Sequence, residues 1–327
     1  MLTKKNLVDI LENTIDDAVL SVLLADRSTN GNILWCTDDY EILGTGYSAN
    51  NPIEISLISG EKDGIIKPRV EKDTASQQLR SRERGEVFTP SWVCNAQNNL
   101  VDDAWFGIHR KRFNSEKESG WTTNYYPISF REAGGRTWQD YVKATRLEVS
   151  CGEAPYLTSR YDTVTGKYIA VPSRIGLLDR KLRVISENVT SQQDWLAWAI
   201  TAVQNTYGYD LQGDNVLLAR ENILFSVVEA YYHIFDSLPE KKVILTLADI
   251  ISWNIWQMDG IKFVVPNTCH QEIEEQFGIF EIAHEVHECC GCKTGDPYKH
   301  NGVYCLIKDW DTGEKIRFVD LMKGAKV

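Results

Sequence analysis

The sequence predicts an α/β protein built on a doubly wound parallel sheet, and two widely separated segments carry this prediction. Residues 146–156 and 207–222 each contain a short apolar run that ends in a turn with an acidic residue, and a helical pattern follows each turn. Ligands of such sheets bind where the carboxyl ends of the strands meet, so both turns are expected at one edge of the sheet.

The other elements follow from hydrophobic periodicity and from turn residues. Thr89 and Pro90 suit the cap and the first position of a helix. The predicted elements, in chain order, are a helix over 5–25, short strands over 31–60, a helix over 91–102, a loop over 106–135, a long excursion over 157–193, helices over 192–205 and 213–234, a strand over either 243–245 or 248–251, a helix over 270–287, and a hairpin of 302–307 and 315–321.

Composition limits the class of protein. The chain has 327 residues, 43% apolar residues and a net charge of -11, with a mean hydropathy of -0.31. No apolar run is long enough for a membrane span, and the N-terminus has no apolar secretory signal, so a cytoplasmic protein without a membrane partner is predicted. Its eight cysteines are then expected as thiols or metal ligands. The acidic balance argues against nucleic-acid binding over the whole surface, although 79–84 and 110–112 are local basic clusters.

The first turn offers small residues and an acid. Gly152 and Ala154 would let a ligand approach the backbone closely, and Glu148 lies at the end of the strand. At the second turn, Asp210 suits hydrogen bonds from ribose hydroxyls. The alternatives are a plain strand-to-helix turn at the first site and, at the second, Asp210 or Asp214 acting only as a helix cap.

A third segment joins an amide to aromatic rings. The apolar run 248–253 ends at Asn254, which lies between Trp253 and Trp256. An asparagine amide can pair with the edge of a base, and an indole provides a stacking face. The alternative is that both tryptophans belong to the core.

In this order the segments resemble the class I S-adenosylmethionine-dependent adenine-N6 DNA methyltransferases, and most of all the modification subunits (subunit M) of restriction systems. Residues 85–90 match the family's Gly-x-x-Phe-Thr-Pro segment, whose Phe88, Thr89 and Pro90 would contact the methionine end of the cofactor. Glu148, Cys151, Gly152, Ala154 and Tyr156 correspond to the family's cofactor turn, and Tyr207, Gly208, Asp210, Leu211, Ala219, Arg220 and Asn222 correspond to its aromatic-Gly-x-Asp strand and the helix after it.

The family's catalytic Asn-Pro-Pro-aromatic motif aligns with Asn254, Ile255, Trp256 and Gln257, without the prolines and with glutamine in place of the aromatic residue. The resemblance implies methyl transfer from S-adenosylmethionine to an adenine flipped out of DNA. The Asn254 side chain and the Ile255 carbonyl would accept hydrogen bonds from the adenine amino group, while Trp256 or Trp253 stacks on the base.

The resemblance also implies an organisation and partners. It predicts a Rossmann-like methyltransferase domain over 84–327 that closes with an antiparallel hairpin, and residues 1–83 form an α+β extension before it. The implied partners are DNA and a specificity or restriction subunit. Two other functions stay open: a catalytically degenerate binding subunit of a defence or phage-encoded complex, and a methyltransferase for RNA or protein glutamine.

A Cys/His-rich segment over about 284–305 predicts a structural zinc site. Cys289, Cys292, His300 and Cys305 have a spacing that can close a tetrahedral site. Cys290, His284 and His287 are nearby candidates that leave the ligand choice open, and reduced structural thiols are the alternative.

Overall fold

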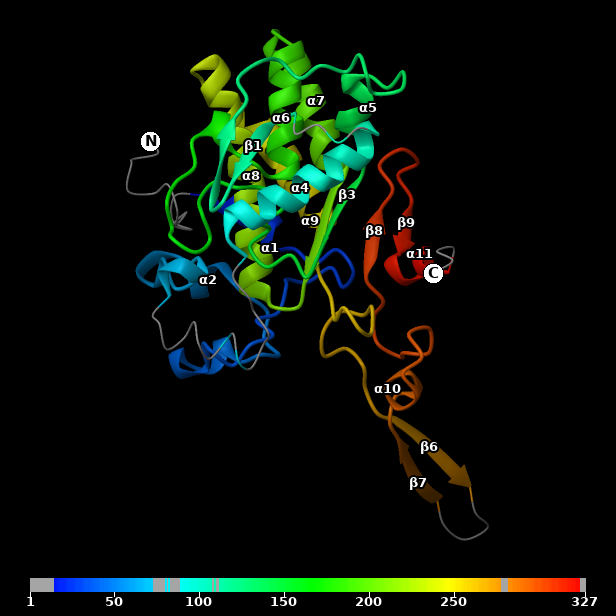
Figure 1. Cartoon of the computed structure of the whole chain (residues 1–327). Helices are drawn as coiled ribbons and strands as arrows, with labels where there is room; N and C mark the ends of the chain where they lie inside the picture. The colour runs from blue at the N-terminus through cyan, green and yellow to red at the C-terminus, as the bar shows by residue number, and fades with distance from the viewer. Residues whose placement is uncertain are drawn as a thin grey trace.

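The computed structural model describes residues 15–72, 80, 82, 89–107, 109, 112–277 and 282–323. Its described part is a mixed α/β structure with one three-stranded parallel sheet and three antiparallel hairpins (Figure 1). This confirms the predicted α/β class. The assignment to the methyltransferase fold within that class stays a prediction.

The N-terminal part, residues 15–72, is mostly helical turns and loops. Its two α-helices are α1 (Asp17–Leu24) and α2 (Ile55–Ile58), and short 3-10 turns cover Glu41–Leu43, Thr45–Tyr47, Gly60–Lys62 and Arg69–Glu71. The prediction of strands within 31–60 is wrong, because the extended residues there form only the isolated bridges Ala25–Asn32 and Leu34–Pro52.

The next elements connect the N-terminal part to the parallel sheet. Helix α4 (Ser91–Phe106) follows Pro90, which occupies the cap position, so Thr89 is not the cap. The predicted loop over 106–135 contains the hairpin of β1 (Asn114–Lys117) and β2 (Gly120–Thr123). Helix α5 (Trp138–Lys143) starts with a capping box between Thr137 and Asp140 and leads into the sheet.

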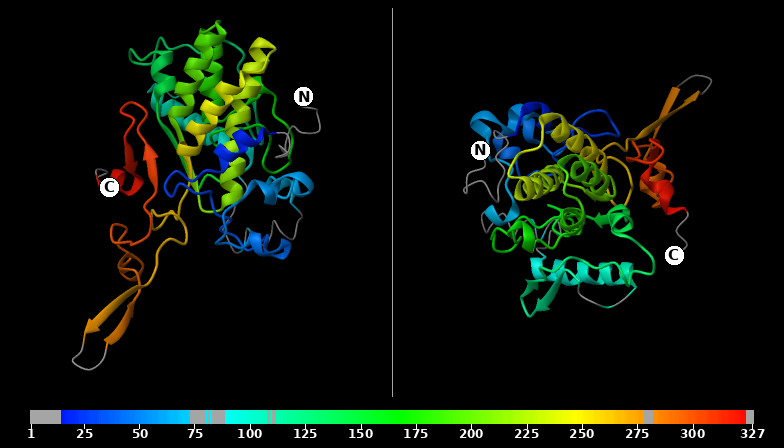
Figure 2. Two further views of the ribbon diagram at one scale, coloured as in Figure 1. Left: turned by 180° about the vertical axis from the view of Figure 1, so that it is seen from behind. Right: turned by 90° about the horizontal axis from the view of Figure 1, so that it is seen from above.

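The parallel sheet has the order β3 (Arg146–Val149), β4 (Thr206–Asp210) and β5 (Ile255–Gln257). The connections contain α6 (Leu177–Asn188), α7 (Gln192–Gln204), α8 (Gly213–Phe235) and α9 (Lys241–Asn254). Figure 2 shows these helices gathered into one body, which we call the helical body. Helix α6 lies within residues 157–193, which were predicted as a long excursion.

The predicted strand over 243–245 or 248–251 is wrong, because both segments belong to α9. Leu247, Ala248, Ile250 and Ile251 are all buried in this helix. A continuous apolar run fits a buried strand and a buried helix equally well, so periodicity alone did not separate them.

Residues 258–323 form what we call the C-terminal lobe. It contains β6 (Glu272–Phe277), β7 (Ile282–His287), α10 (Cys290–Thr294), β8 (Leu306–Lys308), β9 (Lys315–Arg317) and α11 (Phe318–Met322). The β8–β9 pair confirms the predicted closing hairpin with shorter strands. The predicted helix over 270–287 is wrong: β6 and β7 pair as a hairpin that projects away from the body (Figure 1), consistent with its β-branched and aromatic residues.

The two faces of the parallel sheet pack differently. Ile255 belongs to the large hydrophobic core of the body. Tyr209 and Trp256 point to the other face and pack with Met258, Val265, Cys305, Ile307 and Phe318 of the C-terminal lobe. Helices thus cover one face and the lobe the other, which differs from the predicted doubly wound arrangement. Among the described residues, no helix is long and apolar enough to cross a membrane.

Candidate functional site

The predicted cofactor residues of β3 and β4 lie together at the carboxyl edge of the sheet. The Gly152 N–H donates to Asp210 Oδ2 at 2.9 Å, and the Gln212 N–H donates to Asp210 Oδ1 at 3.0 Å. Glu148 accepts from the backbone N–H groups of Tyr156 at 3.3 Å and Leu157 at 3.2 Å. Glu148 and Asp210, which lie far apart in the sequence, therefore both accept hydrogen bonds from backbone N–H groups of the turn that follows β3.

The turn itself has an unusual backbone. Ser150, Gly152 and Ala154 have φ values of 51°, 53° and 62°, a region that non-glycine residues rarely adopt and that often marks functional sites. The space beside Gly152 is open, since a Cβ atom added there would meet no other atom within 4 Å. The buried Cys151 thiol and Ala154 side chain point inward.

The segment before α4 completes the cluster. Burial raises the pKa of Tyr156, and Cys94 and Thr89 are near enough to influence that pKa; Asn98 Nδ2 donates to the Tyr156 carbonyl at 2.9 Å. Pro90 follows Thr89 and precedes α4. Phe88 and Gly85 lie outside the described residues.

Burial raises the pKa values of the two acids at this edge of the sheet. The pKa of Glu148 is raised well above its ordinary value, first by burial and further by the charge of Asp210. The pKa of Asp210 is also raised by burial, although backbone N–H groups of Gln212 and Gly152 oppose the shift. Leu211 is exposed, and its carbonyl accepts from Gln257 Nε2 at 2.8 Å.

Asn254 lies at the opposite end of the sheet. Its Nδ2 donates to the carbonyls of Val203 at 2.9 Å, Gln204 at 3.0 Å and Thr206 at 3.2 Å, and its Oδ1 accepts from Trp310 Nε1 at 2.8 Å. Thr206 begins β4 whereas Asp210 ends it. The expectation that Asn254 meets the cofactor turn is therefore wrong. Asn254 is the last residue of α9, and the next residue, Ile255, begins β5.

The three residues after Asn254 are also bound within the protein. The Ile255 carbonyl accepts from Arg220 Nε at 2.8 Å, and Trp256 is buried with its Nε1 on Met258 Sδ at 3.4 Å. Gln257 hydrogen-bonds to the backbone of Leu34. Its Oε1 accepts from the Leu34 N–H at 2.7 Å, and its Nε2 donates to the Leu34 carbonyl at 2.7 Å. These groups hold the fold together, and none of them is presented to a base.

Sequence reasoning missed a buried charge network beside Asp210. At the start of α8, Asp214 accepts from Arg80 Nη1 at 2.6 Å, Tyr40 Oη at 2.8 Å and Lys72 Nζ at 3.0 Å. Burial would raise the pKa of Asp214, but Lys72 and Arg80 outweigh it and hold that pKa far below its usual range. No local pattern marks such pairs, because their members come from distant parts of the chain.

A second candidate site is a cluster of three cysteines and a histidine in the C-terminal lobe. The ligand atoms of Cys269, Cys289, Cys292 and His300 all lie within 4.8 Å of one another and could hold a metal ion. The three sulfur atoms lie 3.6, 3.7 and 3.7 Å from His300 Nδ1. Bonds of about 2.3 Å to sulfur and 2.0 Å to nitrogen in a tetrahedron would separate these atoms by roughly 3.6 Å.

The backbone around the cluster favours thiolates. The Asn301 N–H donates to Cys289 Sγ at 3.3 Å. Burial would raise the pKa of Cys289, but hydrogen bonds from Asn301, Cys292 and His300 lower it to about 6. Gly291 has no room for a side chain, because an added Cβ would lie 2.6 Å from the ring of His300.

Three of the four predicted metal ligands are in this cluster, and Cys305 is not. Cys305 is buried in the contact between lobe and body, with its Sγ on the Gln257 carbonyl at 3.3 Å. Cys269 takes its place. Because Cys269 lies far along the chain from Cys289 and Cys292, the spacing of cysteines and histidines did not indicate that it joins the cluster.

Comparison of the chain with protein-family models, curated proteins and solved structures finds no match.

Proposed function

We propose that this protein binds S-adenosylmethionine at the carboxyl edge of β3 and β4 and serves as a binding subunit rather than as the methyltransferase itself. The observation that carries the proposal is the cluster of Tyr156, Glu148, Gly152 and Asp210, in which backbone N–H groups donate to both acids beside an open backbone turn.

The chemistry of the cluster fits an adenosyl ligand. A carboxylate offers about four lone-pair sites, and the hydrogen bonds from Gly152, Gln212 and Asn215 use three of those of Asp210. The remaining site can accept a ribose hydroxyl. Glu148 would shape the turn rather than touch the ligand, because both of its oxygens already accept backbone N–H groups.

The placement of Asn254 favours a subunit over a complete enzyme. Four residue steps along β4 separate Thr206 from Asp210, or about 13 Å at about 3.3 Å per residue. Asn254 is fully buried, three carbonyls share its two amide hydrogens and an indole donates to its oxygen, so its amide is not presented to adenine. This supports the alternative of a catalytically degenerate binding subunit over DNA adenine methylation by this chain alone.

Titration calorimetry with S-adenosylhomocysteine tests the binding. We expect saturable binding by the wild-type chain and about tenfold weaker binding for Asp210→Asn, because one acceptor becomes a donor, a change of about 1.4 kcal/mol. Asp236→Asn is the matched control, since Asp236 is exposed at the end of α8. Absence of binding by the folded wild-type chain would refute the proposal.

Transfer of labelled methyl from S-adenosylmethionine distinguishes the two functions. We expect no label in duplex DNA, RNA or protein. Label in DNA that is lost in Asp210→Asn would instead restore the enzymatic hypothesis.

We also propose that the Cys269, Cys289, Cys292 and His300 cluster binds zinc in a structural role. Three sulfur ligands and one imidazole are typical of closed structural zinc sites, whereas catalytic sites keep a position for water.

A further inference from the structure

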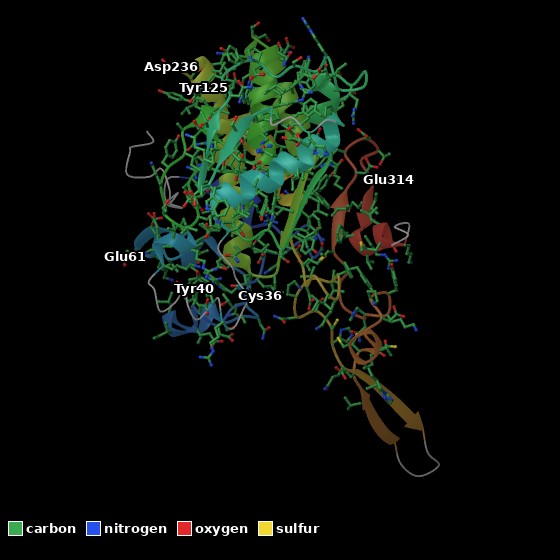
Figure 3. All side chains as sticks on the ribbon, viewed as in Figure 1. Cys36, Tyr40, Glu61, Tyr125, Asp236 and Glu314 are labelled. Carbon is green, nitrogen blue, oxygen red and sulfur yellow. The ribbon has the colours of Figure 1, made fainter. Side chains whose placement is uncertain are left out.

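A small cavity lies in the helical body, between α6, α8 and the 3-10 turn Val171–Ser173. Its volume is about 250 Å³, below the roughly 300–1,000 Å³ of pockets that hold drug-sized ligands, so it suits a single ring. Tyr125 and His233 are exposed members of its lining, and Figure 3 shows Tyr125 at the same end of the molecule as Asp236, the residue after α8. Its aliphatic lining consists of Val171, Pro172, Leu182, Ala230 and Ile234.

Several polar side chains of the lining are already bound within the protein. Arg183 Nε donates to Glu187 Oε1 at 2.8 Å, and Glu187 Oε2 accepts a backbone N–H at 2.7 Å. Ser186 Oγ donates to a carbonyl of its own helix and accepts from Trp195 Nε1, each at 2.9 Å. These three side chains therefore serve the fold.

Arg174 and Asp179 also line the cavity, and each keeps one unused polar atom. Arg174 is a buried side chain whose Nη2 donates to Glu229, but its Nη1 has no partner among the described residues. The hydrogen bonds that Asp179 accepts from Ser159 and Gly176 all end on Oδ2, and within the described ranges Oδ1 accepts none. Burial raises the pKa of Asp179 and the charge of Arg174 opposes the rise, so the two side chains lie near each other. The cavity thus offers an unused donor close to an unused acceptor.

The charges of the lining do not select an ion. Arg174 and Arg183 are matched by Asp179 and Glu187, so the lining as a whole favours neither a phosphate nor an ammonium group. A neutral ligand with an N–H beside a carbonyl would satisfy both unused atoms, and burying such paired groups costs little. Nucleobases have this kind of edge, and aliphatic side chains can cover the faces of their rings.

We propose that this cavity binds a pyrimidine ring with the edge of uracil or thymine, in which a ring N–H lies next to a carbonyl. The carbonyl would accept from Arg174 Nη1, and the ring N–H would donate to Asp179 Oδ1. The site is separate from the candidate cofactor edge, because Ala230 lies about 25 Å along α8 from Gly213 at about 1.5 Å per residue. The inference therefore does not depend on cofactor binding.

Ligand-observed NMR titration of the full chain tests the proposal. The probe is 1-methyluracil, and the control is 1,3-dimethyluracil, which keeps both carbonyls but lacks the ring N–H. We expect saturable binding of the probe and at least tenfold weaker binding of the control. Equal binding of the two compounds, or no binding of the probe by the folded wild-type chain, would overturn the proposal.

Variants then locate the site. Asp179→Asn should weaken the probe at least tenfold and remove its preference over the control, because the unused acceptor becomes a donor while the remaining oxygen still accepts the backbone N–H groups. Ala230→Phe should abolish binding by filling the cavity, and it leaves every polar group of the lining in place. Ala197→Phe, on the exposed surface of α7, is the matched control and should change nothing. Circular dichroism and thermal melting confirm that each variant is folded. Probe binding that survives in folded Ala230→Phe would overturn the proposal.

A free nucleoside and a base within a nucleic-acid strand present the same edge, and two further probes distinguish these sources. If a uridylate octamer binds at least tenfold more tightly than uridine and Ala230→Phe removes the difference, the ring comes from a strand. If the octamer binds no more tightly than uridine, the ring comes from a free nucleoside. Both results support the proposed site. Ala230→Phe should leave S-adenosylhomocysteine affinity unchanged, so failure here does not affect the proposed function.

Discussion

The helical body and the C-terminal lobe are stabilised in different ways. The body buries an extensive apolar core and adds internal charge networks around Asp214 and Glu229. The lobe contributes a few apolar side chains to one small cluster shared with β4 and β5, and it gathers Cys269, Cys289, Cys292 and His300. A region with so little apolar surface needs another source of stability, and a bound metal can supply it. Figure 3 shows the side chains of the body crowded together.

The contact between these regions depends on a few specific groups. Trp310 of the lobe donates to Asn254 at the end of α9, Cys305 contacts the Gln257 carbonyl, and the Leu306 N–H donates to Ser28 Oγ at 2.9 Å. Residues predicted to act on a base therefore join the two regions instead. An amide in a catalytic-type motif is therefore available to a ligand only if the fold leaves its hydrogen-bonding groups unused.

Metal removal should give the largest difference between the regions. We expect chelation, or Cys269→Ser, to unfold the lobe while the body keeps its helices, because structural zinc typically contributes on the order of 10 kcal/mol to small domains. Hydrogen exchange on holo and metal-free protein, with metal content by mass spectrometry, measures this. Cys305→Ser is the matched control and should retain one zinc per chain. Equal protection of the lobe in both states would refute a structural metal.

Asn254→Ala should destabilise the contact between the regions by about 3 kcal/mol. It leaves the buried carbonyls of Val203, Gln204 and Thr206 and the Trp310 N–H short of a partner, and unsatisfied buried groups cost about 1–3 kcal/mol each, with partial relaxation. Urea unfolding measures the loss. Asn188→Ala is a milder control, because Asn188 Nδ2 bonds a carbonyl within its own helix α6. A near-neutral Asn254→Ala with weakened ligand binding would instead support a role in the site.

Asp214→Asn should destabilise the protein, and the loss should depend on pH. The folded pKa of Asp214 is depressed because Lys72 and Arg80 outweigh its burial. Its contribution is therefore complete above the unfolded pKa of about 4 and is lost as pH falls toward the folded value, by about 1.4 kcal/mol per pH unit. Unfolding free energies at pH 7, 4 and 3 should show the gap between wild type and variant narrowing below pH 4. A constant gap would contradict this ion pairing.

Local patterns identified much of the sheet and one end of the candidate site. The apolar runs before Cys151 and at 206–210, and the helix after Gly213, form as predicted, because each has a period and a turn that only one local structure satisfies. The acids Glu148 and Asp210 were placed correctly at one edge for the same reason, since parallel strands align their carboxyl ends. Cys289, Cys292 and His300, three members of the cluster that could hold a metal ion, were identified from their short spacing.

Tertiary packing decided the rest. The run before Asn254 becomes a helix because it fits between α1, α7 and α8 in the body core, and this choice places Asn254 at the amino end of the sheet. Cys269 replaces Cys305 because the chain returns past β6 and β7 to the cluster, whereas Cys305 enters the contact with Gln257. Sequence patterns predicted most of the candidate ligand residues, although they missed Cys269. Only the three-dimensional structure determined which of them the protein's own backbone had already bound, because hydrogen-bond saturation depends on neighbours that are distant along the chain.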